Sequence, residues 1–387
     1  MVQKQLNPQQ IVIQKSLDED KETSRAYHKF RQSIKAPTTL RAYNYSLDKF
    51  MTLSNLKSYD RVIKLNGENV QGLLEDYIIS LKNYRFQTAN LYLAGVELFL
   101  DMNMVLYHKK ILRKLLPNND AEQGGKLPYK TEEIERMLSV TTKLRTKAVI
   151  HYLASTGSRP AGIEDPVLRL KHIEDMPHNC KSVFIYDGSK QGYYAFLTPE
   201  ASKSLNNYLR QRKLNGEILT EESPVFVNIE GFPTARQEHL SSSSARQMVG
   251  DMVLKAGIER IKKGKRYDKA IIYGFRKRFN TILKLNNDVN SNIAEKLMAH
   301  KRGLDGTYLQ PTREECFAEF LKAIPQLTID DSERKQALLD VALKEKSKLE
   351  EKNEENKLVQ NELTRQGIVL ENVLSELKEL KKKKKSI

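Results

Sequence analysis

The sequence predicts a mainly α-helical protein with one small β-sheet, built as two domains followed by a charged helical extension. The length of 387 residues exceeds the roughly 100 to 200 residues of one domain. Apolar residues recur at helical spacings of three and four in both halves. Only residues 182–198 (SVFIYDGSKQGYYAFLT) contain two β-branched or aromatic runs around a turn rich in Gly, Asp and Ser, which indicates a β-hairpin with Lys190 at its tip.

The N-terminal part predicts a flexible arm and then an all-helical domain. Residues 1–24 are polar and weakly patterned, so we expect the arm there. The first strong helix follows Pro37, where Thr38 or Thr39 can cap it. The apolar stripe of this helix consists of Leu40, Tyr43, Leu47, Phe50 and Met51. The domain is expected over residues 25–116, and its further helices are expected at 69–81, 87–100 and 108–115.

A polar break at 117–128, with Pro117 and the pair Gly124-Gly125, predicts a linker. The second domain is expected over 129–325. Thr131 can cap its first helix, because two glutamates follow in the first turn. The other helices expected here are 144–156, ending at Gly157 in the usual position after a helix, then 199–214, 245–256, 273–285 and 291–300.

Residues 326–387 form a highly charged extension. Leu349, Leu363, Leu370 and Leu377 occupy positions seven or fourteen apart, with Asn356 between the first two, which is typical of one seam of a coiled coil. Polar residues in the second seam and Gly367, expected to interrupt the helix, leave a solvated single helix as the alternative. The run of lysines at 381–385 favours non-specific attraction to phosphates or a disordered tail.

The composition indicates a polyanionic partner. Lys and Arg number 65 against 49 Asp and Glu, a net charge of +16, which attracts nucleic acid or an anionic membrane surface. Without a run of about 20 apolar residues or the apolar core of a secretory signal, we expect a soluble, cytoplasmic protein. Cys180 and Cys316 lack the paired spacing of a zinc site, and no Gly-rich nucleotide loop occurs. We therefore expect neither metal nor cofactor.

Separated basic and phenolic residues in the second domain suggest phosphoryl chemistry performed by side chains alone. A phosphodiester can be cut without a metal when a nucleophile attacks phosphorus, fixed cations hold the non-bridging oxygens and an acid protonates the leaving oxygen. Arginine suits the clamp because its guanidinium stays charged and binds phosphate as a fork. The candidates are Arg159 after Gly157, Lys190 in the hairpin turn, Tyr273 and Arg276 in the string YGFR, His300 at a predicted helix end, and Tyr308.

Each candidate also has an ordinary structural explanation. Lys190 can be a general acid or an exposed turn lysine. His300 can support a phosphate or simply cap a helix, where cationic imidazole is favoured. Tyr308 can form a phosphotyrosyl link that stores bond energy for re-ligation, but the chain has 17 tyrosines, most of which must serve packing.

The order Arg, Lys, Tyr-x-x-Arg, His, Tyr over residues 159–308 resembles the catalytic signature of the tyrosine recombinases, or phage integrases. TGSRPAGIEDPVL is similar to the segment of the first family arginine, GSKQGYYAFLTPEA to the lysine hairpin, and LMAHKRGLDGTYLQP to the segment leading to the nucleophile. The resemblance covers most of residues 130–325. A weaker similarity covers 25–115, where TTLRAYNYSLDKFM resembles the first helix of the family's core-binding domain.

The resemblance implies a helical core-binding domain and an integrase-type catalytic domain that close around double-stranded DNA, with four protomers exchanging strands between paired sites. It also implies the roles of the site residues. Arg159 and Arg276 would hold the scissile phosphate, Lys190 would protonate the leaving oxygen, and His300 would support the phosphate. Tyr308 would be the nucleophile.

Three positions depart from the family pattern. Tyr273 stands where the family usually has His, Gly162 where it often has an acidic residue, and Ala299 where it usually has Gly. Two other functions therefore stay open beside recombination, integration or excision of a mobile element. Type IB topoisomerases use similar chemistry to relax DNA, and a DNA-binding protein of the same fold could have lost activity.

Overall fold

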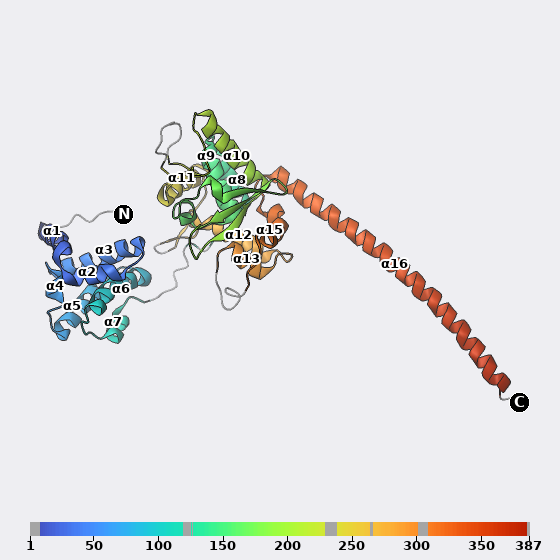
Figure 1. Cartoon of the computed structure of the whole chain (residues 1–387), viewed down its shortest axis with the longest axis horizontal. Coiled ribbons are helices and arrows are strands. Elements are labelled where there is room, and N and C mark those ends of the chain that lie inside the picture. Colours follow the sequence, from blue (N-terminus) through green and yellow to red (C-terminus); the bar gives the residue numbers. More distant parts are fainter. Residues whose placement is uncertain are drawn as a thin grey trace. The chain divides into compact units, whose positions relative to one another are not determined.

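The computed structural model describes residues 8–118, 125, 127–228, 238–263, 266–300 and 309–384. The chain divides into two compact units, Met1–Ala121 and Glu122–Ile387 (Figure 1). The division falls inside the segment predicted as a linker, 117–128. Of the helices in the described ranges, none is both long enough and apolar enough to cross a bilayer.

The first unit has helices as the regular elements of its described residues, as predicted for 25–116. Its core is formed by fully buried side chains that include Phe30, Phe50, Leu74 and Phe99. Its helices are α1 (Pro8–Thr23), α2 (Arg25–Ser33), α3 (Pro37–Leu53), α4 (Tyr59–Val62), α5 (Gly67–Ser80), α6 (Phe86–Met102) and α7 (Lys109–Leu115).

The expectation of a flexible N-terminal arm is wrong for residues 8–23, which form α1. Ile13 and Leu17 of this helix are buried. The Asp20 carboxylate accepts a hydrogen bond from the backbone N–H of Tyr59 at 2.7 Å, which joins α1 to the start of α4. Only two apolar side chains of α1 are buried in the core, and polar contacts with residues distant in sequence also fix the helix in place. The helix therefore has little apolar periodicity to detect.

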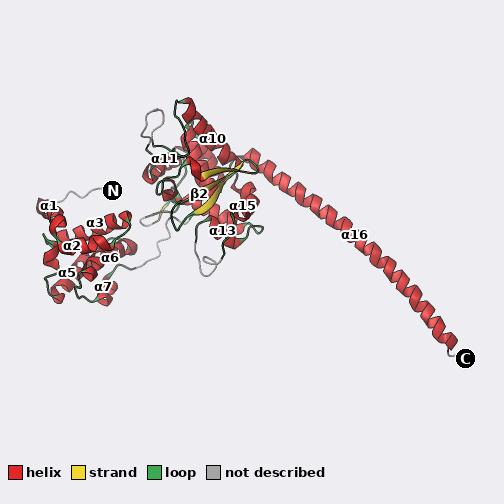
Figure 2. Ribbon diagram, viewed as in Figure 1, coloured by secondary structure: helices red, strands yellow, loops and turns green. Residues whose placement is uncertain are grey.

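The second unit contains a helical body and a small antiparallel sheet (Figure 2), which confirms the predicted fold class. The sheet has the order β1-β2-β3, and a separate two-stranded ribbon joins β4 and β5. The elements are α8 (Thr131–Ser139), α9 (Leu144–Thr156), the 3-10 helices η1 (Pro160–Ile163) and η2 (Leu170–His172), β1 (Ile173–Met176), β2 (Cys180–Ile185), β3 (Tyr193–Leu197), α10 (Pro199–Leu214), α11 (Ser242–Lys255), β4 (Lys262–Lys263), β5 (Arg266–Tyr267), α12 (Tyr273–Leu285), α13 (Ser291–Leu297), α15 (Arg313–Leu327) and α16 (Asp331–Lys384).

The predicted hairpin is confirmed. Strands β2 and β3 pair antiparallel, and the last pair before the turn is Ile185 with Tyr193. The turn between them carries Lys190. Strand β1, which the sequence did not predict, adds a third member through pairs such as Ile173 with Val183.

Several helix ends differ from the predicted ones. Helix α3 begins at Pro37 with Ala36 as its N-cap, so neither Thr38 nor Thr39 caps it. Helix α8 is capped at Lys130 rather than Thr131, and the Glu133 carboxylate accepts the Lys130 backbone N–H at 2.9 Å. In both helices the extended N-cap residue comes earlier than expected, and Pro37 in α3 or the Glu133 contact in α8 fixes the first turn.

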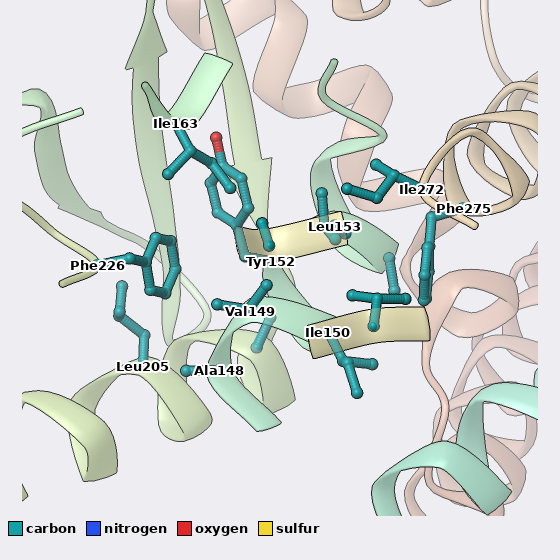
Figure 3. Close-up of a cluster of buried hydrophobic side chains, with 14 of the residues drawn as sticks. Ala148, Val149, Ile150, Tyr152, Leu153, Ile163, Leu205, Phe226, Ile272 and Phe275 are labelled. Atoms are coloured by element: carbon teal, nitrogen blue, oxygen red, sulfur yellow. The ribbon is translucent and has the colours of Figure 1, made fainter. Parts of the chain in front are cut away.

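Helix α9 lies at the centre of the second unit. Figure 3 shows its residues Val149 and Leu153 among side chains of neighbouring elements, with Phe226 on one side and Ile272 and Phe275 on the other. Val149 and Leu153 are fully buried. This packing fixes the C-terminal end of α9, which leads to Arg159, against the first turns of α12, which carries Arg276.

Gly157 makes that close approach possible. Its φ of 56° lies in the left-handed region, and a Cβ there would lie 2.6 Å from Cδ1 of Phe279 in α12. Only glycine fits both the backbone conformation and the space. The glycine that ends α9, as predicted, is therefore also a contact point between α9, which leads to Arg159, and α12, which carries Arg276.

Helix α16 continues through Gly367, so the expected interruption is wrong. A glycine inside a helix costs only about 1 kcal/mol, which the surrounding helix formers offset. Leu349, Leu363, Leu370 and Leu377 are each half exposed or more. These four leucines of the seam are therefore not buried by the parts of the chain that the structure describes.

Candidate active site

The Arg276 side chain joins the end of α9 to the segment after α13. Its guanidinium is buried, with Nη1 donating to the Gly157 carbonyl at 2.8 Å and Nη2 donating to the Met298 carbonyl. The same Nη2 lies 3.0 Å from Nε2 of His300. Two of the predicted site residues, 24 positions apart, are thus in direct contact.

The backbone after α13 directs His300 toward this arginine. The helix ends at Leu297 rather than at His300, and the His300 N–H donates to the Glu295 carbonyl at 2.9 Å. This closure requires a left-handed residue just before it, and Ala299 has φ of 50°. An alanine is strained there, because its Cβ crowds the backbone in a region that glycine enters freely.

A carboxylate holds the imidazole from its other side. Nδ1 of His300 lies 2.6 Å from Oε2 of Glu295, and Oε1 of Glu295 pairs with Lys284 at 2.8 Å. With Nδ1 donating to the carboxylate, Nε2 is left to face Arg276. Glu295 therefore fixes which edge of the ring is presented to the site.

The site gathers positive charge and neutral phenols. The pKa of Arg276 is lowered by burial and then by the like charge of Arg159, and the phenols of Tyr193, Tyr273 and Tyr186 oppose that change. Bringing two guanidinium groups together is unfavourable unless an anion joins them. The arrangement is therefore suited to binding an oxyanion between the two arginines.

His300 belongs to the same electrostatic cluster. Burial lowers the pKa of its imidazole, the hydrogen bond that it donates to Glu295 opposes this, and the charges of Arg276 and Arg159 lower the pKa further. The neutral form is therefore favoured in the folded protein. A bound anion would offset part of the lowering of the His300 pKa by the arginines, so that protonating the imidazole would require less free energy.

The structure thus brings together four of the predicted site residues: Arg159, Tyr273, Arg276 and His300. Tyr273 is the first residue of α12 and is 43% exposed, so its phenol is open to a ligand. Lys190 lies exposed in the hairpin turn, and its role stays a prediction. Tyr308 falls outside the described residues.

Sequence reasoning missed three residues of this cluster. Tyr186 and Tyr193 flank the hairpin turn that carries Lys190, and both are buried beside the arginines. Glu295 lies five positions before His300, a spacing that matters only once the helix closes as described. Among the described residues, no group of three or more His, Cys, Asp or Glu is placed to hold a metal ion.

Comparisons with known proteins give matches in structure only. No protein family model matches the chain, and no curated protein matches its sequence. The XerH site-specific recombinase bound to a palindromic difH substrate matches with a TM-score of 0.50 and 16% identity, over 73% of this chain and 79% of that one. The Tn1549 transposon integrase in complex with transposon right end DNA also has a TM-score of 0.50 and 16% identity, over 80% and 98%.

These two matches cover 73% and 80% of the chain and support one fold. The protein described here therefore has the tyrosine recombinase (integrase) fold. The solved structures to which the chain is similar include a site-specific recombinase and a transposon integrase.

Proposed function

We propose that this protein is a site-specific DNA recombinase that cuts and rejoins strands through a 3′-phosphotyrosyl intermediate, serving integration or excision of a viral or mobile element. The observation that carries the proposal is the contact of Arg276 with His300 at 3.0 Å, beside the like-charged Arg159. This cluster fits a phosphodiester, and its fold is that of enzymes acting on DNA. The net charge of +16 supports a double-stranded DNA partner.

In the proposed reaction, Arg159 and Arg276 hold the non-bridging oxygens of the scissile phosphate. The Tyr308 oxygen attacks phosphorus and gives up its proton to the surrounding water, while the bond from phosphorus to the 5′ oxygen breaks. Lys190 supplies the proton that the 5′ oxygen takes up. Attack by a 5′ hydroxyl of another strand on the phosphotyrosyl bond reverses these steps and joins the new strands.

Tyr273 and His300 complete this assignment. The Tyr273 phenol, half exposed at the start of α12, donates a hydrogen bond to the phosphate in the place where the resemblance implies a histidine. His300 supports the phosphate through the ring edge that faces Arg276. Neither residue is required to carry the charge that the arginines supply.

The first prediction concerns the nucleophile. Tyr308→Phe should abolish the covalent protein–DNA adduct and leave DNA affinity unchanged, because it removes one oxygen and no charge. A pool of nicked duplexes with randomised sequence is incubated with the full chain, and adducts are recovered after denaturation and sequenced. The nick releases the short strand after cleavage, so the adduct accumulates.

The controls separate the three functions. An adduct that survives in Tyr308→Phe would move the nucleophile elsewhere. Relaxation of supercoiled plasmid without sequence preference would favour a topoisomerase, and duplex binding with no adduct in the wild type would favour a DNA-binding protein. Recovery of one shared sequence from the pool is the outcome that supports recombination.

We further propose that four protomers assemble on paired DNA sites and that α16 contributes to this assembly as a coiled coil. The exposed leucines Leu349, Leu363, Leu370 and Leu377 repeat at heptad spacing, and burying them against another copy would stabilise a helix that is marginal alone.

The second prediction is that removing residues 331–387 lowers the number of protomers per DNA in sedimentation and leaves the adduct yield on a single nicked duplex unchanged. The single substitution Leu363→Glu in the full chain should act in the same direction. If the truncated chain binds DNA with the same number of protomers as the full chain, α16 has no part in the assembly.

A further inference from the structure

Tyr186 adopts a backbone conformation that side chains rarely take. Its φ is 63°, in the left-handed region, where a Cβ crowds the following carbonyl. Two residues later in the same turn, Gly188 has φ of 72°, so this turn uses glycine at one left-handed position and a bulky tyrosine at the other. Strain kept at a non-glycine residue points to a use for its side chain.

The Tyr186 phenol fills the space beside the turn that carries Arg159. The backbone N–H of Gly162 donates to the Arg159 carbonyl at 2.9 Å, so the two residues share one 3-10 turn. A Cβ on Gly162 would lie 3.8 Å from the Tyr186 hydroxyl oxygen and 2.9 Å from Cγ2 of Ile185. Ile185 therefore leaves little room for a side chain at 162, and the Tyr186 hydroxyl lies at contact distance from this turn.

The phenol interacts with the arginines. Burial raises the pKa of Tyr186, while the nearby charges of Arg159 and Arg276 lower it. In the described part of the chain, neither arginine forms an ion pair with a carboxylate. The carboxylate of Glu295 in this cluster binds His300 and Lys284 instead.

We propose that Tyr186 is a positioning residue that orients the Arg159 guanidinium for phosphate through a neutral hydrogen bond. The proposal rests on the proposed function and deepens it. A carboxylate in this place would hold the guanidinium more tightly, but it would also neutralise the charge and repel the incoming phosphate. A phenol fixes the direction of the fork and leaves the full positive charge for the ligand. The strained turn keeps the phenol in that place.

The test is a double-mutant cycle that needs no strand cleavage. Binding of inorganic phosphate to the full chain is measured by calorimetry for the wild type, Tyr186→Phe, Arg159→Met and the double variant. Tyr186→Phe should weaken phosphate binding about tenfold, the usual size of one lost hydrogen bond to a charged group. In the Arg159→Met background the same change should have no effect, because there is no guanidinium left to orient.

Tyr194→Phe is the matched control. Tyr194 is also in the hairpin but is exposed, 36%, and its ring lies 5.9 Å from the guanidinium of Arg313, so its phosphate affinity should equal that of the wild type. A urea midpoint of Tyr186→Phe equal to that of the wild type shows that the fold is kept.

Two results would overturn the proposal. One is phosphate affinity unchanged in Tyr186→Phe, and the other is an equal loss with and without Arg159. Failure to find a covalent adduct in the wild type would instead refute the recombinase function and leave this cycle intact.

Discussion

The two faces of α12 each bury an arginine, and they use it differently. On one face, Arg278 is 3% exposed and donates from Nη2 to Thr131 Oγ1 at 3.0 Å and to the carbonyls of Gln326 and Leu327 at 3.0 and 3.1 Å. Burial lowers its pKa to about 10, and the charge of Glu200 opposes this. The acceptors around Arg278 all belong to the fold.

On the other face, Arg276 also donates to two carbonyls, but its charged neighbour is another arginine, Arg159. An opposite charge stabilises a buried cation, whereas a like charge destabilises it. The comparison teaches that burial alone does not mark a site residue. The informative difference is whether the chain itself supplies the counter-charge or leaves that place for a ligand.

The third prediction sharpens this comparison with matched substitutions and has the largest expected effect. Arg276→Met should lower the rate of adduct formation by about 10²- to 10³-fold, the usual loss when one charged donor to a developing oxyanion is removed. Arg278→Met should leave two carbonyls at the end of α15 and the Thr131 hydroxyl of α8 without this donor, and should lower the free energy of unfolding by about 3 kcal/mol. Adduct kinetics and urea unfolding are measured for both variants.

The two variants control each other. Arg276→Met should lose less stability than Arg278→Met, because removing one of two like charges offsets part of the lost hydrogen bonding. Folded Arg278→Met should form the adduct at nearly the wild-type rate. Equal losses of activity and stability in both variants would show that the two faces of α12 do not differ in the way described.

Sequence alone predicted the elements whose ends have strong local signals. Helix α9 ends at Gly157, and helix α10 begins at Pro199, as expected. The spacing of Phe275 and Phe279 also separated Arg276 from the apolar stripe, and the structure places Arg276 against His300. These features depend on neighbours three or four positions away, which a sequence displays directly.

The remaining parts of the site depend on contacts distant in sequence. Tyr186 reaches Arg159 only because the hairpin folds back with a left-handed residue, and no pattern of residue types signals that conformation. Helix α1 was missed for a related reason, since its Asp20 finds a partner 39 positions away. Prediction from the sequence fails where tertiary contacts override the local pattern.

The fourth prediction has a smaller expected effect and concerns the carboxylate behind His300. Because Glu295 raises the pKa of His300 against burial and the charges of the arginines, Glu295→Gln should lower that pKa further. The His300 resonance, one of seven histidines, is followed by NMR from pH 8 to pH 4 and assigned with His300→Gln. Adduct formation should fall about tenfold, because a charge-assisted hydrogen bond that orders the ring becomes a neutral one.

The sign of the stability effect follows from linkage. The pKa of His300 in the folded protein lies below the unfolded value of about 6.5. Its contribution to stability is therefore complete above that pH. The contribution is lost as the pH falls toward the folded pKa, because the unfolded chain binds more protons. Glu295→Gln should therefore unfold more readily than the wild type on acidification and widen the pH window of this loss. Glu319→Gln is the control, because Glu319 pairs with Lys322 at 2.6 Å and has no contact with the ring. If the pKa of His300 is the same in Glu295→Gln and Glu319→Gln, Glu295 does not act on the ring, and the arginines are the charged groups that set this pKa.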